Sequence, residues 1–511
     1  MNMSSRALSP HTPIGVIGAG AMGAGIAQVA AAAGHTVHLL DARDGAAAQA
    51  IAGIQAQFDK MAAKGKMSAE AAQAASQRLQ AAASVSELAG TGLVVEAIVE
   101  NLDVKRDLFR QLETVCSASC IFATNTSSIS VTSIAAGLNN PARLVGMHFF
   151  NPAPLMALVE IISGLATDAS LAGVLFDTAQ AWGKTPVLAK STPGFIVNRV
   201  ARPFYAEGLR LLQEGAADSA TLDAIMRELG GFRMGPFELM DMIGHDVNFA
   251  VTQSVWRAFY NDPRFLPSLI QQELVEAGYL GKKTKRGFYN YAEGASVPVA
   301  HTQAAVACPK HITVYGESRA ATALAKRLAT AGLTVQRAPA HEGRLAQADG
   351  VSIFETDGRT ATLRAQATGV SQPVLCDVAL NPDTATRMAI SVAQQANALA
   401  LQAATGLFQA AGYAVSFLRD VPGLAVMRTV AMLANEAADA VNQGVCDAPG
   451  ADTAMRLGVN YPRGPLAWAD DIGVAHVHTV LKHLGEFYGE DRYRVSPFIQ
   501  QSVYAGKTLH V

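Results

Sequence analysis

The sequence contains few cysteines, few aromatic residues and little charge. Its 511 residues include five cysteines, and these show no metal-ligand spacing with the histidines. This argues against a disulfide framework and against a structural zinc site. Charged residues make up 16% of the chain and the formal net charge is −2, so no overall basic field indicates a nucleic-acid partner. We expect a reduced, cytoplasmic protein that holds no metal and binds no nucleic acid.

The chain also lacks recognisable targeting and membrane segments. Residues 1–13 are polar and contain no apolar core of a secretory signal. Residues 14–34 form an uncharged apolar run long enough to cross a bilayer. Glycines cluster near the start of that run, which favours a strand, a tight turn and a buried helix over a membrane span. Half of all residues are hydrophobic, and this length and composition predict three to four soluble globular domains.

Strand and helix patterns alternate through the first part of the chain and predict a parallel sheet of the α/β class. The expected strands are 14–18, 36–41, 93–97, 121–124, 143–149 and 158–162. Between the second and third of these, about residues 45–83 predict two helices broken near Gly65. From Phe195 to about Leu280 the sequence predicts consecutive helices, and residues 292–310 resemble a linker.

A glycine-rich turn follows the first predicted strand. Gly18, Gly20 and Gly23 have the spacing of a dinucleotide-binding fingerprint, in which glycines permit a tight turn, close approach of a pyrophosphate and close helix packing. The helix that begins there presents free N–H groups to phosphates. The second strand ends at Asp41, near the distance expected for the acid that binds the adenosine ribose, which favours NAD over NADP. Arg43 lies close enough to leave NADP open.

The second part of the chain repeats the first in weakened form. Residues 312–335 echo residues 14–37, and residues 422–428 echo residues 193–199. The predicted fold class is therefore an α/β Rossmann dinucleotide-binding domain followed by an all-α domain, then a degenerate repeat of both. The predicted domains are an NAD-binding Rossmann domain, a helical domain, a degenerate Rossmann-like segment and a second helical domain, at 1–188, 189–295, 308–415 and 416–511.

Polar residues follow several predicted strands at their carboxyl ends, which is the edge where an open α/β sheet binds ligands. Residues 125–128 follow one strand and His148 lies at the end of another. Glu160 lies within the next apolar strand, where an unpaired acid is costly. Oxidation of an alcohol needs a base, and a carboxylate partner fixes the tautomer of a histidine in that role. Taken singly, His148 also fits a buried core histidine and Glu160 a structural ion pair.

Together these segments resemble the 3-hydroxyacyl-CoA dehydrogenases. The resemblance is collinear over about residues 13–291 and rests on residues 18–23, 95–101, 125–128, 148–152 and 193–199. It implies that the catalytic base is His148, that its carboxylate partner is Glu160, that Ser127 binds the substrate oxygen and that Asn198 helps to order the site. It also implies contacts with the cofactor NAD from Asp41, Glu100, Lys105 and Asn151.

The resemblance further implies an acyl-CoA substrate, whose phosphates require cations. Lys60, Lys64 and Lys66 lie near the break of the helical pair after Asp41, and this region contacts CoA in the family. Lys64 is the best match for a substrate-binding residue. A solvated lysine cluster is an equally good interpretation, as an exposed helix lysine is for Lys105.

The second half has lost the residues of this chemistry. One glycine of three remains in residues 316–321, Pro339 stands where Asp41 would align, and Met427 replaces Asn198. We found no counterpart of residues 148–152, so this half is expected not to bind NAD. A second helical domain implies an internal pseudo-dimer, with a homo-oligomer also open. The layout resembles stand-alone family members of phenylacetate degradation, which implies 3-hydroxyadipyl-CoA as the substrate.

Other functions remain open from the sequence. Within the family, the alternative is a 3-hydroxybutyryl-CoA or general fatty acyl dehydrogenase. Outside enzymes, the alternative is a non-catalytic NAD-binding sensor or scaffold, against which the complete set of Ser127, His148, Glu160 and Asn198 argues. A phosphogluconate-type β-hydroxyacid dehydrogenase would use a lysine base and would lack the His-Phe-Phe-Asn-Pro element that this chain has at residues 148–152.

Overall fold

The computed structural model describes residues 6–510, so the first five residues of the polar N-terminal segment lie outside it. The chain folds into two compact units. One contains the chain up to Arg199 together with Gln443–Val459, and the other contains Val200–Asn442 and the chain from Asn460 onward. Within the described residues, no helix has the length and apolarity needed to cross a membrane.

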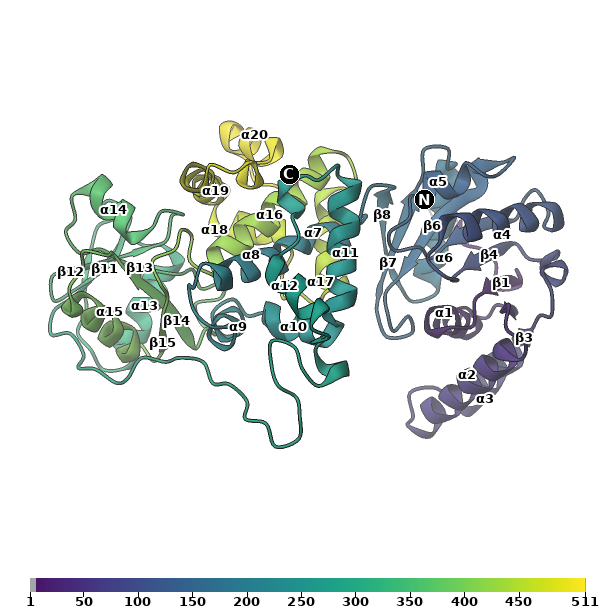
Figure 1. Ribbon diagram of the computed structural model, residues 1–511, viewed down its shortest axis with the longest axis horizontal. Coiled ribbons are helices and arrows are strands. Elements are labelled where there is room, and N and C mark those ends of the chain that lie inside the picture. Colours follow the sequence, from purple (N-terminus) through teal and green to yellow (C-terminus); the bar gives the residue numbers. More distant parts are fainter. Residues whose placement is uncertain (1–5, 511) are drawn as a thin grey trace, which may run out of the picture. The chain divides into compact units, whose positions relative to one another are not determined.

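The first unit is built on an eight-stranded sheet with the order β3-β2-β1-β4-β5-β6-β7-β8 (Figure 1). The strands are β1 (Ile14–Ile17), β2 (Val37–Leu40), β3 (Leu79–Ala81), β4 (Leu93–Glu96), β5 (Ile121–Thr124), β6 (Leu144–Phe149), β7 (Leu158–Ser163) and β8 (Thr185–Lys190). β1, β4 and β5 are buried at every position, because a sheet covered on both faces needs continuous apolar strands. This confirms the α/β prediction for the first part of the chain.

The sheet differs from the predicted parallel one at a single step between neighbours. β7 runs antiparallel to β6, while the other neighbours pair in parallel. Only residues 150–157 join these two strands, and a parallel connection needs a crossover of a dozen or more residues. The antiparallel register sets His148 directly opposite Glu160. β3 is a second difference, since this short strand lies within the segment predicted to be helical.

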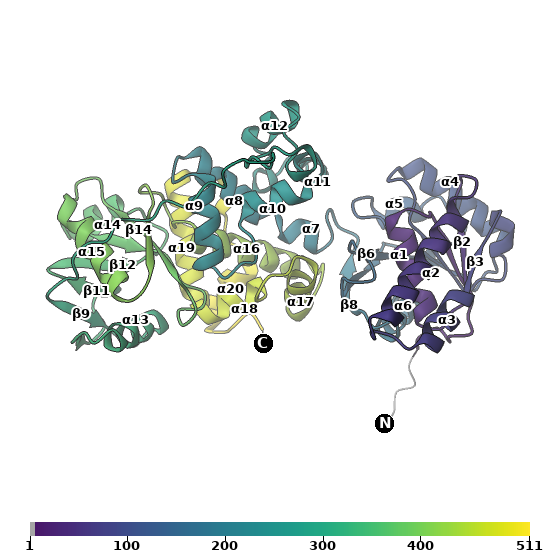
Figure 2. The same ribbon diagram turned by 90° about the horizontal axis from the view of Figure 1, so that it is seen from below.

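Helices cover both faces of the first sheet. One face carries α1 (Ala21–Ala32), α2 (Ala46–Ala63), α3 (Ala69–Gln77) and α6 (Ala169–Ala181), which share one apolar core (Figure 2). The other face carries α4 (Leu102–Val115) and α5 (Val131–Ala135), and Phe109 of α4 packs on Phe122 of β5 with ring centroids 5.6 Å apart. Short 3-10 turns occur at Val85–Leu88 and Pro141–Arg143, and α7 spans Val197–Val200.

The second unit combines the helices of both repeats with the second sheet. Its first-repeat helices are α8 (Arg202–Gln213), α9 (Ser219–Glu228), α10 (Pro236–Ile243), α11 (His245–Ala258) and α12 (Leu269–Glu276). Its second-repeat helices are α16 (Val426–Asn442), α18 (Pro465–Ile472), α19 (Val474–Tyr488) and α20 (Pro497–Ala505). α17 (Ala448–Gly458) belongs to the first unit instead. Arg428 of α16 forms a buried ion pair with Glu207 of α8 at 2.7 Å, so the two helical repeats pack against each other.

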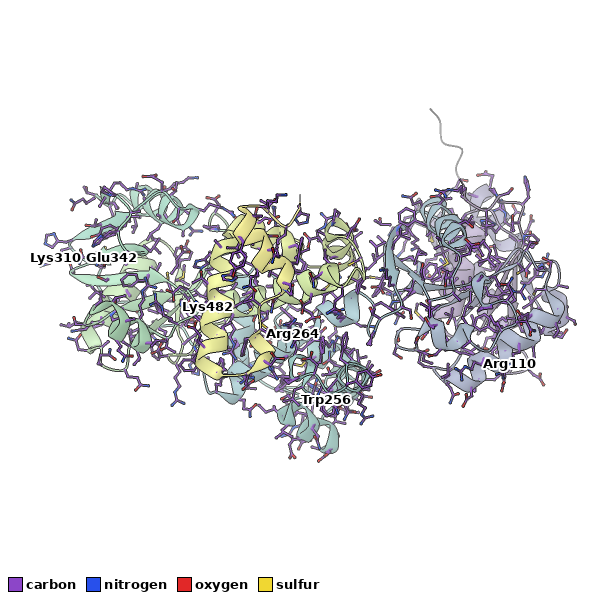
Figure 3. All side chains as sticks on the ribbon, turned by 90° about the horizontal axis from the view of Figure 1, so that it is seen from above. Arg110, Trp256, Arg264, Lys310, Glu342 and Lys482 are labelled. Carbon is purple, nitrogen blue, oxygen red and sulfur yellow. The ribbon has the colours of Figure 1, made fainter. Side chains whose placement is uncertain are left out.

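The second sheet is a reduced version of the first. Its seven strands have the order β10-β9-β11-β12-β13-β14-β15. They are β9 (Ile312–Tyr315), β10 (Gln336–Ala338), β11 (Arg344–Ala348), β12 (Val351–Glu355), β13 (Val374–Cys376), β14 (Arg387–Val392) and β15 (Ala414–Phe417), with helices α13 (Arg319–Thr330), α14 (Ala361–Thr368) and α15 (Ala398–Ala410). A tight β11–β12 hairpin stands where the first sheet has α2 and α3. Within this unit, Lys310 and Glu342 lie at the outer rim of the second sheet and Arg264 lies among the helices (Figure 3).

Candidate active site

The glycine-rich turn between β1 and α1 has an open approach for a ligand. Gly18 has φ +103°, and a side chain on Gly23 would meet the Gly18 carbonyl oxygen at 1.7 Å. By contrast, nothing lies within 4 Å of the position where a side chain on Gly20 would begin. Gly20 is also the N-cap of α1 and makes no side-chain cap. Folding therefore requires Gly18 and Gly23, while the free space at Gly20 and the uncapped helix end fit a pyrophosphate.

Asp41 lies directly beyond β2 and faces this turn. Its carboxylate accepts a hydrogen bond from the Ala19 N–H at 2.7 Å and from Arg43 Nε at 3.1 Å. The hydrogen bond from Arg43 holds the pKa of Asp41 at about 2, so the group is ionised at neutral pH. Arg43 is itself well exposed, with 73% of its side chain accessible. The carboxylate is thus placed to accept ribose hydroxyls, and Arg43 tethers it.

Glu100 organises the loop that follows β5. Its Oε1 accepts hydrogen bonds from Thr126 Oγ1 at 2.6 Å, from the Ser127 N–H at 3.0 Å and from the Ser128 N–H at 3.1 Å. Burial opposes ionisation of Glu100, but the Thr126 hydrogen bond and the charge of Lys105 outweigh it and lower the pKa. Glu100 therefore fixes the backbone of Ser127.

Lys105 is buried and paired with two carboxylates. Its side chain is 1% exposed, and Nζ lies 2.5 Å from Glu96 Oε1 and 3.2 Å from Glu100 Oε2. The interpretation as an exposed helix lysine is therefore wrong, because α4 directs this residue back over the carboxyl ends of β4 and β5. Sequence reasoning missed the part played by Glu96. The signal was present, since an acid that ends the buried strand 93–97 needs a partner.

His148 and Glu160 form a close pair on neighbouring strands. His148 Nδ1 lies 2.6 Å from Glu160 Oε2, and the two residues are 6% and 0% exposed. An ionised carboxylate can only accept, so the Nδ1–H donates, and in the neutral imidazole this tautomer leaves the lone pair on Nε2. Glu160 Oε1 also accepts the N–H groups of Ile196 and Val197, both at 3.0 Å. Glu160 thus ties the histidine to the segment that carries Asn198.

Asn198 lies across the site from the loop after β5. Its Nδ2 donates to the Ser127 carbonyl oxygen at 3.4 Å. Ser127, His148, Glu160 and Asn198 are therefore brought together at the carboxyl ends of β5 and β6. Phe150, which sequence reasoning did not single out, covers His148 with ring centroids 4.5 Å apart.

Two predicted site residues, Asn151 and Lys64, are exposed on the surface of the first unit. Asn151 is exposed in the turn after β6 and precedes a cis peptide bond to Pro152. Lys64 is the exposed C-cap of α2, which lies toward the β2–β3 edge of the sheet, whereas His148 and Glu160 lie on β6 and β7. A ligand that touched both regions would have to be extended, as a CoA thioester is.

The second repeat fills the corresponding positions with structural contacts. Ser318 takes the place of Gly20, and its hydroxyl caps α13 by accepting the Ala321 N–H at 3.1 Å. Asp377 lies at the end of β13 opposite Ala389, where the first sheet has His148 opposite Glu160. Its carboxylate accepts the N–H groups of Ala425, Val426 and Met427 at 2.7–2.9 Å. The second repeat therefore does contain a degenerate counterpart of the end of β6, in which Asp377 takes the place of His148 and anchors the start of α16.

Comparison with known proteins agrees with this architecture. The family model for the 3-hydroxyacyl-CoA dehydrogenase NAD-binding domain matches residues 13–192. The model for the family's C-terminal domain matches twice, at residues 194–291 and 423–509. The model for the 3-hydroxybutyryl-CoA dehydrogenase reduced Rossmann-fold domain matches residues 353–422. These matches confirm the predicted fold class and its internal repeat.

Individual relatives cover either the whole chain or its first half. The 3-hydroxyadipyl-CoA dehydrogenase of Escherichia coli K12 is 44% identical over 500 residues, which cover 96% of each chain. Human mitochondrial hydroxyacyl-coenzyme A dehydrogenase is 42% identical over 284 residues, or 54% of this chain and 90% of that protein. A crystal structure of 3-hydroxybutyryl-CoA dehydrogenase from E. coli K12 superposes with a TM-score of 0.89 at 42% identity, covering 98% of this chain and 99% of that one.

The chain belongs to the 3-hydroxyacyl-CoA dehydrogenase family. It is an NAD-dependent enzyme that oxidises the 3-hydroxyl group of an acyl-CoA thioester.

Proposed function

We propose that this enzyme oxidises (S)-3-hydroxyadipyl-CoA to the 3-oxo thioester and that His148 is its catalytic base. The observation that supports the catalytic assignment is the buried His148–Glu160 contact of 2.6 Å. NAD, when bound, supplies the hydride acceptor at the end of the sheet where this pair lies. Nε2 of His148 takes the hydroxyl proton as the carbon–hydrogen bond breaks. Glu160 stabilises the imidazolium that results.

The remaining residues bind and orient in this proposal. Ser127 and Asn198 hold the oxygen at C3, and Glu100 keeps the Ser127 loop in position. Asp41 accepts the ribose hydroxyls of NAD, and Lys105, Glu100 and Asn151 complete the cofactor contacts. Lys64 pairs with a CoA phosphate. The fit is supported by the open space at Gly20 and by the ionised state of Asp41.

The adipyl substrate is favoured by the relative that shares almost the entire chain, including the second half. The alternative is 3-hydroxybutyryl-CoA, which is named for a similarly complete structural match from the same organism. A cytoplasmic location, a homo-oligomer and an internal pseudo-dimer of helical domains also belong to the proposal. The packing of α8 on α16 supports the last of these.

The test is NADH formation with 3-hydroxyadipyl-, 3-hydroxybutyryl- and 3-hydroxyhexanoyl-CoA. We expect the highest kcat/KM with the adipyl thioester, by about tenfold or more, which corresponds to one charge-assisted contact. Equal or better turnover of the butyryl thioester would replace the adipyl assignment. Cofactor binding without turnover of any thioester would favour a sensor or scaffold instead.

A further inference from the structure

The second unit contains a cavity of about 800 Å³ among its helices. The cavity is lined by residues of α8 and α11, by the segment from Pro263 to Leu269 that leads into α12, and by Glu490–Arg492. All of these residues belong to the second unit, whereas the proposed catalytic residues belong to the first. The volume is typical of a small-molecule site, so the charged side chains on the wall indicate which ligand the cavity fits.

Two arginines of this wall occupy equivalent positions in the two repeats. Arg264 is the middle residue of the 3-10 turn Pro263–Phe265, which leads from α11 to α12. Arg492 is the middle residue of the 3-10 turn Asp491–Tyr493, which leads from α19 to α20. Because the turns and the helices around them correspond, a difference between the partners of the two arginines identifies what changed between the repeats.

Arg264 uses every nitrogen of its guanidinium group within the protein. Its Nε donates to the Arg492 carbonyl oxygen at 3.3 Å, and its Nη2 donates to the Arg494 carbonyl oxygen at 2.8 Å. Its Nη1 donates to two carboxylates of α16, those of Glu436 and Asp439. Arg264 is 2% exposed, and this set of partners is what a buried guanidinium requires.

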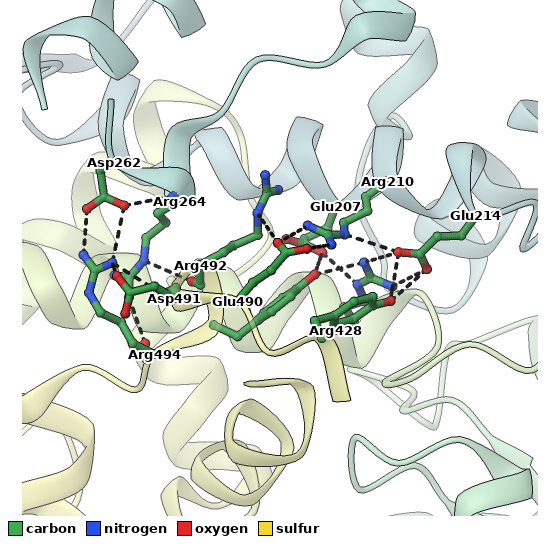
Figure 4. A network of polar contacts seen from close by, with 12 residues as sticks. Glu207, Arg210, Glu214, Asp262, Arg264, Arg428, Glu490, Asp491, Arg492 and Arg494 are labelled. Atoms are coloured by element: carbon green, nitrogen blue, oxygen red, sulfur yellow. Dashed lines mark hydrogen bonds and ion pairs between the residues drawn. The ribbon is translucent and has the colours of Figure 1, made fainter. Parts of the chain in front are cut away.

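Arg492 is also buried, but its guanidinium group makes no hydrogen bond within the part of the chain that the structure describes. Arg492 is 5% exposed, and its buried Nε has no hydrogen-bond partner. Its ion pair is with Glu490, whose Oε2 lies 3.7 Å from Nε, beyond hydrogen-bond distance (Figure 4). Both carboxylate oxygens of Glu490 already accept hydrogen bonds from Arg210. The donors of Arg492 are therefore open to a ligand in the cavity that it lines.

The repeat also shows which carboxylate Arg492 lacks. The sequence offset that relates the ends of α8 and α16 pairs two residues of each helix, Glu207 with Glu436 and Arg210 with Asp439. The glutamate is present in both repeats, and Glu207 is held by Arg428 at 2.7 Å. The aspartate is not, because Arg210 stands at its position. Arg492 thus has a second cation on its wall where Arg264 has a carboxylate.

The acidic residues of the wall do not take over this role. Glu214 accepts a hydrogen bond from Arg428 Nη1 at 3.0 Å. Asp491 accepts one from Arg494 Nη1 at 2.9 Å. Together with the Arg210–Glu490 pair, each carboxylate on the wall is engaged by a guanidinium group other than that of Arg492. An anion from outside the protein would supply the missing partner and offset the cost of burying this charge.

We propose that this cavity binds a small organic carboxylate with an apolar body, and that Arg492 pairs with its carboxylate group as Arg264 pairs with Asp439. A carboxylate matches the fork of guanidinium donors through its two oxygens. An apolar body is favoured because the wall also carries hydrophobic side chains, those of Leu209, Phe265, Leu266 and Leu269. The inference concerns a second ligand site and is independent of the acyl chain of the substrate.

The test is calorimetry on the full-length enzyme with hexanoate and with hexanamide, which has the same shape and no charge. We expect one hexanoate per chain and at least about tenfold weaker binding of hexanamide. Arg492→Gln should weaken hexanoate binding by about 10–100-fold, the usual loss for a hydrogen bond to a charged group, and Arg492→Lys should recover part of it. Ala206→Leu, which narrows the cavity without altering a charge, should also weaken binding. Arg257→Gln, at an exposed arginine of α11, is the control and should leave binding unchanged.

Thermal melts distinguish a ligand-binding arginine from a structural one. Without ligand, Arg492→Gln should melt no lower than wild type, because it removes a buried charge that has no hydrogen bond. Arg264→Gln makes the same change at the fully bonded counterpart and should melt at a lower temperature. Hexanoate should raise the melting temperature of wild type and not that of Arg492→Gln. NADH formation by Arg492→Gln should stay within about threefold of wild type.

Four results would overturn the proposal. The first is hexanoate binding that is equally tight in wild type and Arg492→Gln, and the second is equally tight binding of hexanamide. The third is a melting temperature of Arg492→Gln as low as that of Arg264→Gln, which would make Arg492 a structural residue. The fourth is binding of inorganic phosphate that depends on Arg492 while hexanoate does not bind, which would replace the organic carboxylate with an inorganic anion.

Discussion

Replacing Glu160 with glutamine separates the two tasks of this carboxylate. In the structure, Oε2 accepts the His148 Nδ1–H at 2.6 Å, while Oε1 accepts the N–H groups of Ile196 and Val197 at 3.0 Å. A glutamine keeps an oxygen for the two backbone donors but presents an NH₂ group to Nδ1. Nδ1 must then accept, so the proton moves to Nε2 and the base loses its lone pair. A carboxylate-to-amide change of this kind lowers turnover by about 10⁴-fold elsewhere.

We therefore expect Glu160→Gln to lower kcat by about 10²–10⁴-fold while KM for NAD and the melting temperature stay near those of wild type. Glu160→Ala is the control, because it also strands two buried N–H groups at about 1–3 kcal/mol each and should lower stability as well. Steady-state NADH formation and thermal melts on both variants measure the split. Turnover of folded Glu160→Gln within tenfold of wild type would refute the tautomer argument.

Four further predictions follow from the same structure. His148→Gln should keep NAD binding and lose about 10²–10⁴-fold in turnover; near-normal rates would reject this base. NAD should outperform NADP in kcat/KM because Asp41 faces the ribose, and a reversed preference would mean that Arg43 controls that pocket. If the second half of the chain only supports the fold, calorimetry should find one NAD per chain, and deletion from about Cys308 onward should give a protein that aggregates or dimerises in size-exclusion chromatography. Two NAD per chain, or a truncated protein that is a soluble and active monomer, would contradict this role of the second half. Burial, reinforced by the charge of Asp377, raises the pKa of Glu355 to about 7, so the folded state loses stability as the pH rises from about 4.5 to 7. At pH 8, Glu355→Gln should therefore be more stable than wild type by about 1–3 kcal/mol in denaturant titrations, and this difference should shrink toward zero near pH 4.5.

The sequence predicts those parts of the site in which a residue type is dictated by local geometry. The strands at 14–17 and 121–124, and the glycines at Gly18 and Gly23, follow from burial on both faces and from a turn that has no room for a side chain. Asp41 follows from its position after β2. These requirements act over a few residues, so periodicity and spacing are enough to find them.

Features that depend on pairing over long separations were not predictable in this way. The antiparallel register that sets His148 opposite Glu160 depends on which strand lies beside β6, and the apolar pattern of residues 158–162 is the same for either direction. Lys105 lies on the same face of α4 as the buried Phe109 and Leu112, but helix periodicity cannot show that its charge is paired with Glu96 and Glu100, which lie outside that helix.

Each repeat supplies a helix that packs on the sheet of the other repeat. This explains why the second repeat keeps its packing although it lacks the glycine fingerprint and the histidine of the first. α17 comes from the second repeat, yet it packs on β7 and β8 of the first sheet, and a side chain on Gly458 would approach Leu158 and Val197 within 3 Å. In the first repeat the equivalent helix, α9, packs on β14 of the second sheet. Each sheet is therefore completed by a helix of the other repeat. β7 carries Glu160, so the strand that holds one member of the proposed catalytic pair packs on a helix of the second repeat. In that repeat Ser318 and Asp377 stand where the first has Gly20 and His148, and both side chains accept backbone N–H groups at the start of a helix.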